Sequence, residues 1–425
     1  MRSPMLSACL VLALAHPVFG QGSGKPLTMI EALDEALSRN PDLVALRREY
    51  DAARAVPMQE RYLEAPSFEA QVWAWPVTTL NPTRADMYML MVGQALPGRG
   101  KRASRELVGE RGAEVARQQI SLRANDILDD VRQAYVGLAL ARETVTLYER
   151  QVPVLRELSE AATVRYASGH AEQHDIVGPF VELSRLQAET ITWRARARSE
   201  EARLNTLLGR LVSRSVEPLS PARLTDVPTN PEAVALQRHP GMALVAAEIA
   251  REEAELARLQ GERRPDFVVG GGYMLMPGDA GAWTARAGIT WPNAPWSRGR
   301  IDAAIAAQLL RVEAVAARRE VIASAIRRGV YDAQISLEAA RERASLIATT
   351  TLPHVQHSFE VSRTAYAAGR ADFADIIEGQ RAVLAADVEY AMVQAEVAFA
   401  LADLDRAMGV VPQEPAPAVQ EEEQP

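Results

Sequence analysis

Two histidine pairs have a spacing that could support metal chemistry. His354 and His357 lie three residues apart in a segment with helical periodicity, and His170 and His174 lie four apart. Two histidines on one face of a helix can hold a metal ion. The carboxylates lie elsewhere, however, and surface histidines without partners are common. We therefore expect no metal site and no cofactor at these positions.

Methionines form the second pattern that could carry chemistry. Met87, Met89 and Met91 alternate in a candidate strand, and Met274 and Met276 echo them in a later one. Side chains two apart on a strand share a face, and soft thioethers favour Cu(I). Alternating methionines also make an ordinary apolar surface, so we interpret them as a surface that faces lipid or a neighbouring chain.

Catalytic chemistry has little support in this sequence. No phosphate-binding glycine loop, nucleophile elbow or metal-binding histidine motif on a helix occurs. The sole cysteine, Cys9, lies in the N-terminal leader described next. A net charge of -8 without a basic run argues against a nucleic-acid partner. The sequence therefore does not favour an enzyme.

The N-terminus resembles an export leader. Arg2 precedes an apolar run from Met5 to Ala15, and small residues follow before Gln21. Residues 1–20 are therefore expected to be a signal peptide. A lipoprotein-like pattern ends at Cys9, but the apolar stretch before it is short, so lipidation stays open without being favoured.

The elements that would position these side chains occur twice. Landmark residues recur at a spacing of 199 or 200 residues. They are Asn40 with His239, Pro66 with Pro265, Arg99 with Arg298, Pro153 with Pro353, Tyr166 with Tyr366, Gly169 with Gly369, Asp175 with Asp375, and Gly209 with Gly409. The change from 199 to 200 predicts a one-residue insertion just before Pro353. The chain is thus built from two copies of one unit.

A coiled-coil seam with steps of four and three supports the repeat. In the first copy it comprises Ile127, Val131, Ala134, Leu138, Ala141, Val145 and Tyr148. In the second it comprises Ile326, Val330, Ala333, Leu337, Ala340, Ala344 and Ile347.

Each unit reads as a helix, a β-hairpin and a hairpin of long helices. The first long helix should run from Lys101 to Ala167, roughly 100 Å at 1.5 Å per residue, with a kink or interruption at Pro153. Gly169 and Gly369 permit the reversals. The leading helices are expected at about 29–60 and 231–262, and the strands at about 68–75, 86–95, 266–276 and 283–291. The divisions are 21–215 for the first repeat, 216–231 for a linker, 232–410 for the second repeat and 411–425 for a disordered acidic tail.

The strands suggest a membrane role that needs several chains. Beyond the leader the sequence has no apolar run of the ~18 residues of a spanning helix, so integration would require a β-barrel. Four strands cannot close one, and open edges are not tolerated in hydrocarbon. Two chains would supply eight strands and three would supply twelve. The expected fold is mainly α with a small β part: a long-helix α-barrel joined to a shared transmembrane β-barrel. Soluble hairpins packed on helices are the alternative.

Nearly the whole mature chain resembles the TolC-like outer-membrane factors of tripartite efflux systems. The duplicated unit, the two β-hairpins and the turn segments at 166–176 and 366–376 carry the resemblance. It implies a homotrimer in the outer membrane, with a twelve-stranded barrel in contact with lipid and a helical tube that crosses the periplasm. The turns at Gly169 and Gly369 would be the periplasmic tips, where an adaptor protein and an inner-membrane pump of the RND type would meet the tube.

The same resemblance assigns roles at the tips. Asp375 and Glu378 match two carboxylates that form acidic rings at the channel entrance, although an ordinary solvated helix face would show the same pattern. Tyr366 and Asp175 match partners that close the gate by a hydrogen bond across neighbouring helices. Ala371 stands where the family prototype has arginine, which leaves Arg370 as a substitute.

The cargo is less well indicated. The segment 94–101, Gln-Ala-Leu-Pro-Gly-Arg-Gly-Lys, is similar to the strand-to-helix junction of heavy-metal efflux members. We therefore favour metal cations over drugs, general solutes or secreted proteins of a type I system. A periplasmic coiled-coil protein that binds partners without forming a channel is the alternative from another class.

Overall fold

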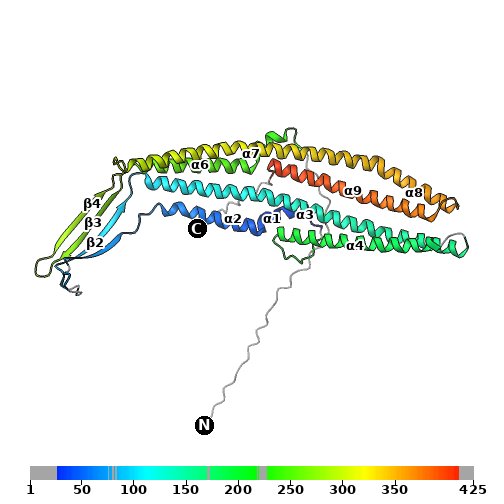
Figure 1. Ribbon diagram of the computed structural model, residues 1–425, viewed down its shortest axis with the longest axis horizontal. Helices are drawn as coiled ribbons and strands as arrows, with labels where there is room; N and C mark the ends of the chain where they lie inside the picture. The colour runs from blue at the N-terminus through cyan, green and yellow to red at the C-terminus, as the bar shows by residue number, and fades with distance from the viewer. Residues whose placement is uncertain are drawn as a thin grey trace, which may run out of the picture.

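The computed structural model describes residues 26–74, 76–78, 81, 84–169, 173–217, 219 and 227–410. It shows an elongated bundle of helices with a small sheet at one end (Figure 1). The expected leader, the acidic tail and the middle of the expected linker lie outside the described residues. In the part of the chain that is described, no helix combines the length and the apolar character needed to cross a membrane.

The order of elements repeats, and the fold is mainly α with a small β part, as predicted. The first copy comprises α1 (Met29–Arg39), α2 (Pro41–Gln59), β1 (Ser67–Trp73), β2 (Met87–Leu96), α3 (Lys101–Ala167) and α4 (Gln173–Leu207). The second comprises α5 (Pro231–Arg238), α6 (Pro240–Gly261), β3 (Phe267–Leu275), β4 (Ala282–Ile289), α7 (Arg298–Leu346), the π-helical turn η2 (Ile347–Thr351), α8 (Leu352–Ala367) and α9 (Phe373–Met408).

The long helix α3 has 67 residues with the predicted bounds, and it continues through Pro153 without the interruption that we considered. Five seam residues of the first copy, from Ile127 to Ala141, and all seven of the second are buried. Each seam packs in a separate core: one joins α1, α2, α3 and α4, and the other joins α5, α7 and α9. The period of apolar residues thus predicts which helix face is buried.

The π-helical turn lies where the spacing of the repeat changes. It spans Ile347–Thr351, directly before Leu352 and Pro353. A π-helical turn accommodates one residue more than an α-helical turn and lets the helix continue. The predicted one-residue insertion is therefore absorbed inside the helix.

The expected continuous leading helices are wrong in one respect, because each is broken by a proline. Asn40 has φ -56° and ψ 128°, and its side chain accepts hydrogen bonds from the backbone of Asp42 and Leu43 at the start of α2. The equivalent His239 caps α6 before Pro240. The ring of proline disfavours helical backbone at the preceding residue, so each leading segment becomes two helices.

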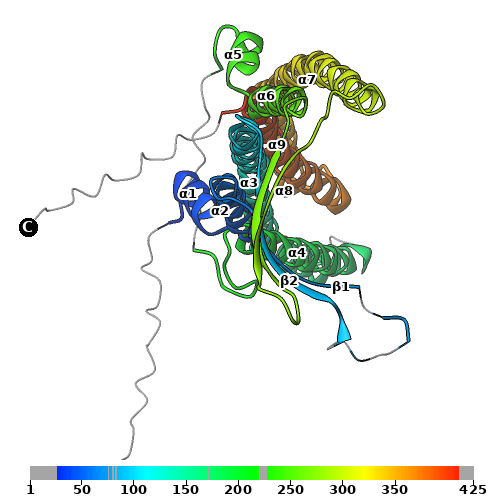
Figure 2. The same ribbon diagram turned by 90° about the vertical axis from the view of Figure 1, so that its left-hand side faces the viewer.

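The four strands form one antiparallel sheet in the order β1-β2-β3-β4 (Figure 2). The central pair joins the two repeats, with Leu90 opposite Tyr273. The outer strands β1 and β4 each pair on one side only within the described residues. The sheet extends beyond the end of the helices (Figure 1).

Segment 94–101 forms the junction between the sheet and the long helix α3, and the contacts there account for its lysine and glycine residues. The Lys101 side chain is 2% exposed, and its ammonium pairs with Asp266 at 2.8 Å and Glu262 at 3.0 Å. The Gly98 backbone N–H donates to Asp266 at 2.8 Å, and a Cβ on Gly98 would lie 2.3 Å from the carbonyl oxygen of Pro265. A buried ammonium is tolerated only when it is paired. The motif therefore fixes the angle between strand and helix.

Candidate functional site

Two helical reversals at the end opposite the sheet form the candidate site (Figure 1). Gly169 and Gly369 have φ of +78° and +71°, and nothing lies within 4 Å of a Cβ built on either. The left-handed backbone, rather than a lack of space, is therefore why glycine stands there. In both turns the glycine N–H donates to the carbonyl of the tyrosine three residues earlier, at 2.9 Å. Both predicted turns are present.

Asp375 and Glu378 lie in the first two turns of α9, and both side chains are exposed. The Asp372 backbone N–H donates to the Asp375 carboxylate at 3.2 Å, which stabilises the start of the helix. Glu378 lies 3.6 Å from Arg381. Ile376 and Ile377 between them are buried, so the two carboxylates share the face that points away from the core.

Tyr366 and Asp175 are both buried, at 8% exposure, on neighbouring helices of one chain. Burial raises the pKa of the Tyr366 hydroxyl above its ordinary value; Arg165 opposes this shift and Asp175 adds to it. The hydroxyl itself has no hydrogen-bond partner among the described residues. The structure therefore brings the two predicted gate residues close together, but does not form the expected hydrogen bond from Tyr366.

Arg165 makes the contact with Tyr366 that the sequence did not reveal. Its guanidinium carbon lies 4.3 Å from the centre of the Tyr366 ring, and Nη1 donates to the Tyr366 carbonyl at 2.7 Å. The ring also packs against Phe373, with centroids 5.7 Å apart. Arg370, the substitute that we considered, is exposed, and Ala371 packs against the core. The arginine that contacts Tyr366 is therefore Arg165 of the first repeat, and not Arg370 of the second.

Two further polar contacts join the repeats at this end. Arg381 of α9 pairs with Glu182 of α4 at 2.7 Å, and the Glu182 side chain is 6% exposed. The Gln380 amide donates to Gln151 of α3. Around them lies an apolar core from both repeats. It contains Leu155, Ala162 and Leu186 of the first and Tyr366, Phe373, Ile376, Ile377, Leu384 and Val388 of the second. The tip is therefore a closed contact between two helical hairpins.

The two tips differ where the repeat would make them alike. Tyr166 is 46% exposed, whereas its counterpart Tyr366 is buried; Asp375 is exposed, whereas its counterpart Asp175 is buried. The packing of the two helical hairpins within the chain buries Tyr366 and Asp175. It leaves the equivalent residues Tyr166 and Asp375 exposed.

The histidines do not form a metal site in the described residues. The His354 ring nitrogen contacts the Thr350 carbonyl at 2.6 Å, and His357 is exposed. His170 and the His174 side chain lie outside the described part. No group of three or more His, Cys, Asp or Glu residues suited to a metal occurs among the residues that the structure describes.

Comparison with known proteins identifies the family to which both repeats belong. The family described as "Outer membrane efflux protein" matches residues 32–210 and 233–410, one match for each repeat. The cobalt-zinc-cadmium resistance protein CzcC of Cupriavidus metallidurans is 25% identical over an alignment of 401 residues, which covers 92% of this chain and 92% of that one.

Solved structures agree on the fold. The CusC channel superposes with a TM-score of 0.77 at 14% identity, covering 92% of this chain and 95% of that one. The CmeC outer membrane channel of Campylobacter jejuni gives a TM-score of 0.73 at 12% identity, covering 96% and 93%.

Proposed function

Because this chain belongs to the outer membrane efflux protein family and is an outer-membrane channel of a tripartite efflux system, we propose that its cargo is metal cations. The observation that carries the proposal is the similarity to CzcC, a cobalt-zinc-cadmium resistance protein, over 92% of both chains. The exposed carboxylates at the tip agree with a cationic cargo. Drugs and general solutes are the competing cargo class. A coiled-coil protein that forms no channel is excluded by the family.

The family forms trimers, and we propose the same for this chain. The unpaired edges of β1 and β4 would pair between chains, so that three sheets pool twelve strands and leave no open edge. Apolar side chains also line the outer surface of α7, where a neighbouring chain would cover them. They include Leu310, Val321, Tyr331 and Ile335, each about half exposed or more.

The helices extend into the periplasm, and we propose that an adaptor protein and an inner-membrane pump of the RND type bind at their tips. In such an assembly three copies of Asp375 and Glu378 would form two acidic rings at the entrance. Rings of carboxylates concentrate cations at a narrow opening. Tyr366 and Asp175 would then stabilise the closed entrance.

Neutralising the rings should lower cation selectivity. In planar bilayers, we expect Asp375→Asn/Glu378→Gln to reduce the cation-to-anion permeability ratio by roughly tenfold, since like charges in a cleft raise local counter-ion concentration by at least that much. Block by multivalent cations should weaken in parallel. Glu338→Gln/Glu342→Gln, which removes two exposed carboxylates near the C-terminal end of α7, is the matched control. Equal selectivity of the tip variant and the unchanged channel would place these carboxylates outside the conduction path.

The cargo is tested by deleting the gene and restoring it. We expect the deletion strain to stop growing at lower zinc, cobalt or cadmium concentrations, and the restored strain to recover. Growth across a panel of drugs and detergents is measured in parallel. Sensitivity to drugs alone, with unchanged metal tolerance, would reject metal cations and favour the general-solute duct.

A further inference from the structure

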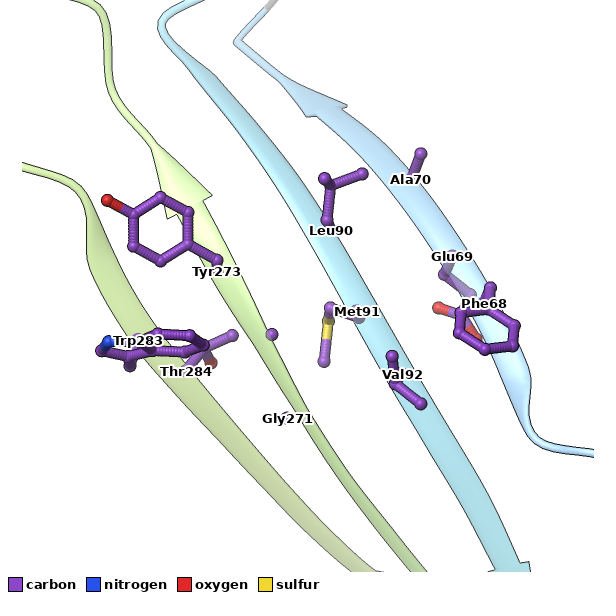
Figure 3. Close-up of a pocket in the computed structure, with 11 residues that line it drawn as sticks. Phe68, Glu69, Ala70, Leu90, Met91, Val92, Gly271, Tyr273, Trp283 and Thr284 are labelled. Atoms are coloured by element: carbon purple, nitrogen blue, oxygen red, sulfur yellow. The ribbon is translucent and has the colours of Figure 1, made fainter.

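The two faces of the sheet differ in chemistry. One face is apolar and exposed, with Phe68, Leu90, Tyr273 and Trp283 contributed by the four strands (Figure 3). Phe68 is 77% and Trp283 is 83% exposed. Alternation along the strands places the polar residues on the other face. That second face, called here the polar face, carries Glu69, Gln71, Thr284 and Arg286.

The methionines lie on the polar face. Met89 is directly opposite Met274 of β3 and, on its other side, Gln71 of β1. Met91 is opposite Glu69, two residues further along β2. The register thus places Met89 and Met91 beside Gln71 and Glu69, and not beside the apolar side chains of the other face.

An ion pair crosses the polar face of the sheet. Arg286 of β4 reaches Glu69 of β1, at 3.9 Å, although two strands lie between them. The positions between are Gly93 and Gly270, which have no side chains to obstruct the guanidinium. In the proposed trimer the polar face would line the channel, and the apolar face would point outward.

We propose that Met87, Met89, Met91 and Met274 form a binding site for soft monovalent cations, Cu(I) or Ag(I), on the wall of the channel. The inference rests on the proposed function in one respect, that metal cations pass along this face. Four thioethers on two adjacent strands supply the soft, neutral donors that these ions prefer over carboxylate or water. Hard or borderline divalent ions gain little from such ligands.

The register allows several sulfurs to reach one ion. Directly opposite residues have Cβ atoms about 5 Å apart and diagonal neighbours about 7–8 Å, both within reach of methionine side chains. Gly272 of β3 lies directly opposite Met91, and a Cβ there would stand 2.9 Å from the Met91 Cγ. A side chain at position 272 would therefore crowd Met91 beside the strand of Met274. The Glu69 carboxylate in the same row can balance the charge of the ion.

A site made only of neutral thioethers also suits transit. A channel needs sites that attract an ion and still release it. Without a thiolate or imidazole, the methionine site should hold Ag(I) weakly enough for exchange along the path.

Ag(I) binding to the purified full chain tests the proposal. Silver nitrate is titrated in chloride-free buffer with calorimetric and equilibrium-dialysis readouts, on the unchanged chain and on Met89→Leu/Met274→Leu. We expect saturable binding in the unchanged chain and its loss in the variant. Leucine matches methionine in size, so the sheet should fold, and assembly is checked by gel filtration. X-ray absorption at the silver edge should report sulfur neighbours only in the unchanged chain.

Met58→Leu/Met392→Leu removes two exposed methionines outside the sheet and is the matched control. Equal silver binding by the unchanged chain and the sheet variant, or a loss in the control as large as in the sheet variant, would overturn the proposal. Zinc, cobalt and cadmium tolerance of cells carrying the sheet variant is measured separately. Lost silver binding with unchanged tolerance would support the site independently of the divalent cargo, whose failure would appear in the deletion strain instead.

Discussion

Arg165→Ala should produce a channel that stays open far more often than the unchanged one. Arg165 contacts the face of Tyr366 and its carbonyl, and so joins the tip of α3 to the end of α8. Losing one partly exposed cation–π contact and one charged hydrogen bond costs about 1–2 kcal/mol. In a trimer the loss occurs three times. A change of that size in each chain shifts the ratio of open to closed tips by roughly 5- to 30-fold.

Single-channel recording in planar bilayers measures this effect as a rise in open probability. Arg156→Ala, an exposed arginine earlier on α3, is the control and should leave gating unchanged. Arg165→Lys keeps the charge but loses the planar group that stacks on the ring, so it should give an intermediate result. If Arg165→Ala gates like the unchanged channel, the contact between the repeats at Tyr366 does not hold the tip closed.

The long-range architecture could be predicted because it follows from the period of apolar residues and from the spacing of the repeated landmarks. The seam from Ile127 to Ala141 predicts a buried helix face from its steps alone. The shift of the repeat from 199 to 200 residues predicts an extra residue, which the structure places in a π-helical turn before Pro353. Such features depend only on neighbours along the chain or on comparison of the two copies.

The contacts at the tip could not be predicted in the same way. Arg165, Glu182 and Arg381 meet across different repeats, and which turn of one helix faces which turn of another is set by lateral packing. The faces of the sheet pose a similar problem. Alternation shows that Met89 and Met91 share a face, but only the register with Gln71 and Glu69 shows that this face is the polar one.

A buried polar cluster between α3 and α9 gives the last prediction. Asp129 of α3 is 3% exposed, and its neighbours on α9 are Asp403 and Arg406. Asp405 of α9 pairs with Arg132 of α3 at 3.8 Å. The Gln133 amide donates to Asp129 at 3.0 Å and to Asp403 at 3.3 Å. The other charged or titratable neighbours are Asp126, Arg132 and, at the start of α6, His239. Burial, followed by repulsion from Asp403, raises the pKa of Asp129 to about 6 despite the two arginines.

This shift predicts a stability that falls as pH rises. A carboxyl whose folded pKa exceeds its unfolded value of 3.8 stabilises the fold below that value, and the contribution is lost as pH rises through about 6. At pH 8 the ionised Asp129 therefore costs the folded chain about 2–3 kcal/mol relative to a neutral side chain. Asp129→Asn should raise the midpoint of thermal unfolding at pH 8 by several degrees and give little change below pH 4.

Thermal unfolding of the detergent-solubilised chain, followed by circular dichroism at several pH values from 4 to 8, measures the difference in midpoint between the variant and the unchanged chain. Asp126→Asn is the informative control, because Asp126 pairs with the same Arg406 at 2.9 Å but is one-third exposed. That variant should lose a favourable ion pair and keep the decline near pH 6. A decline that survives in Asp129→Asn would assign the titration to another group of the cluster. If the decline disappears in Asp129→Asn, protonation of Asp129 stabilises the contact between α3 and α9. Acidification would then strengthen the packing of the two repeats against each other.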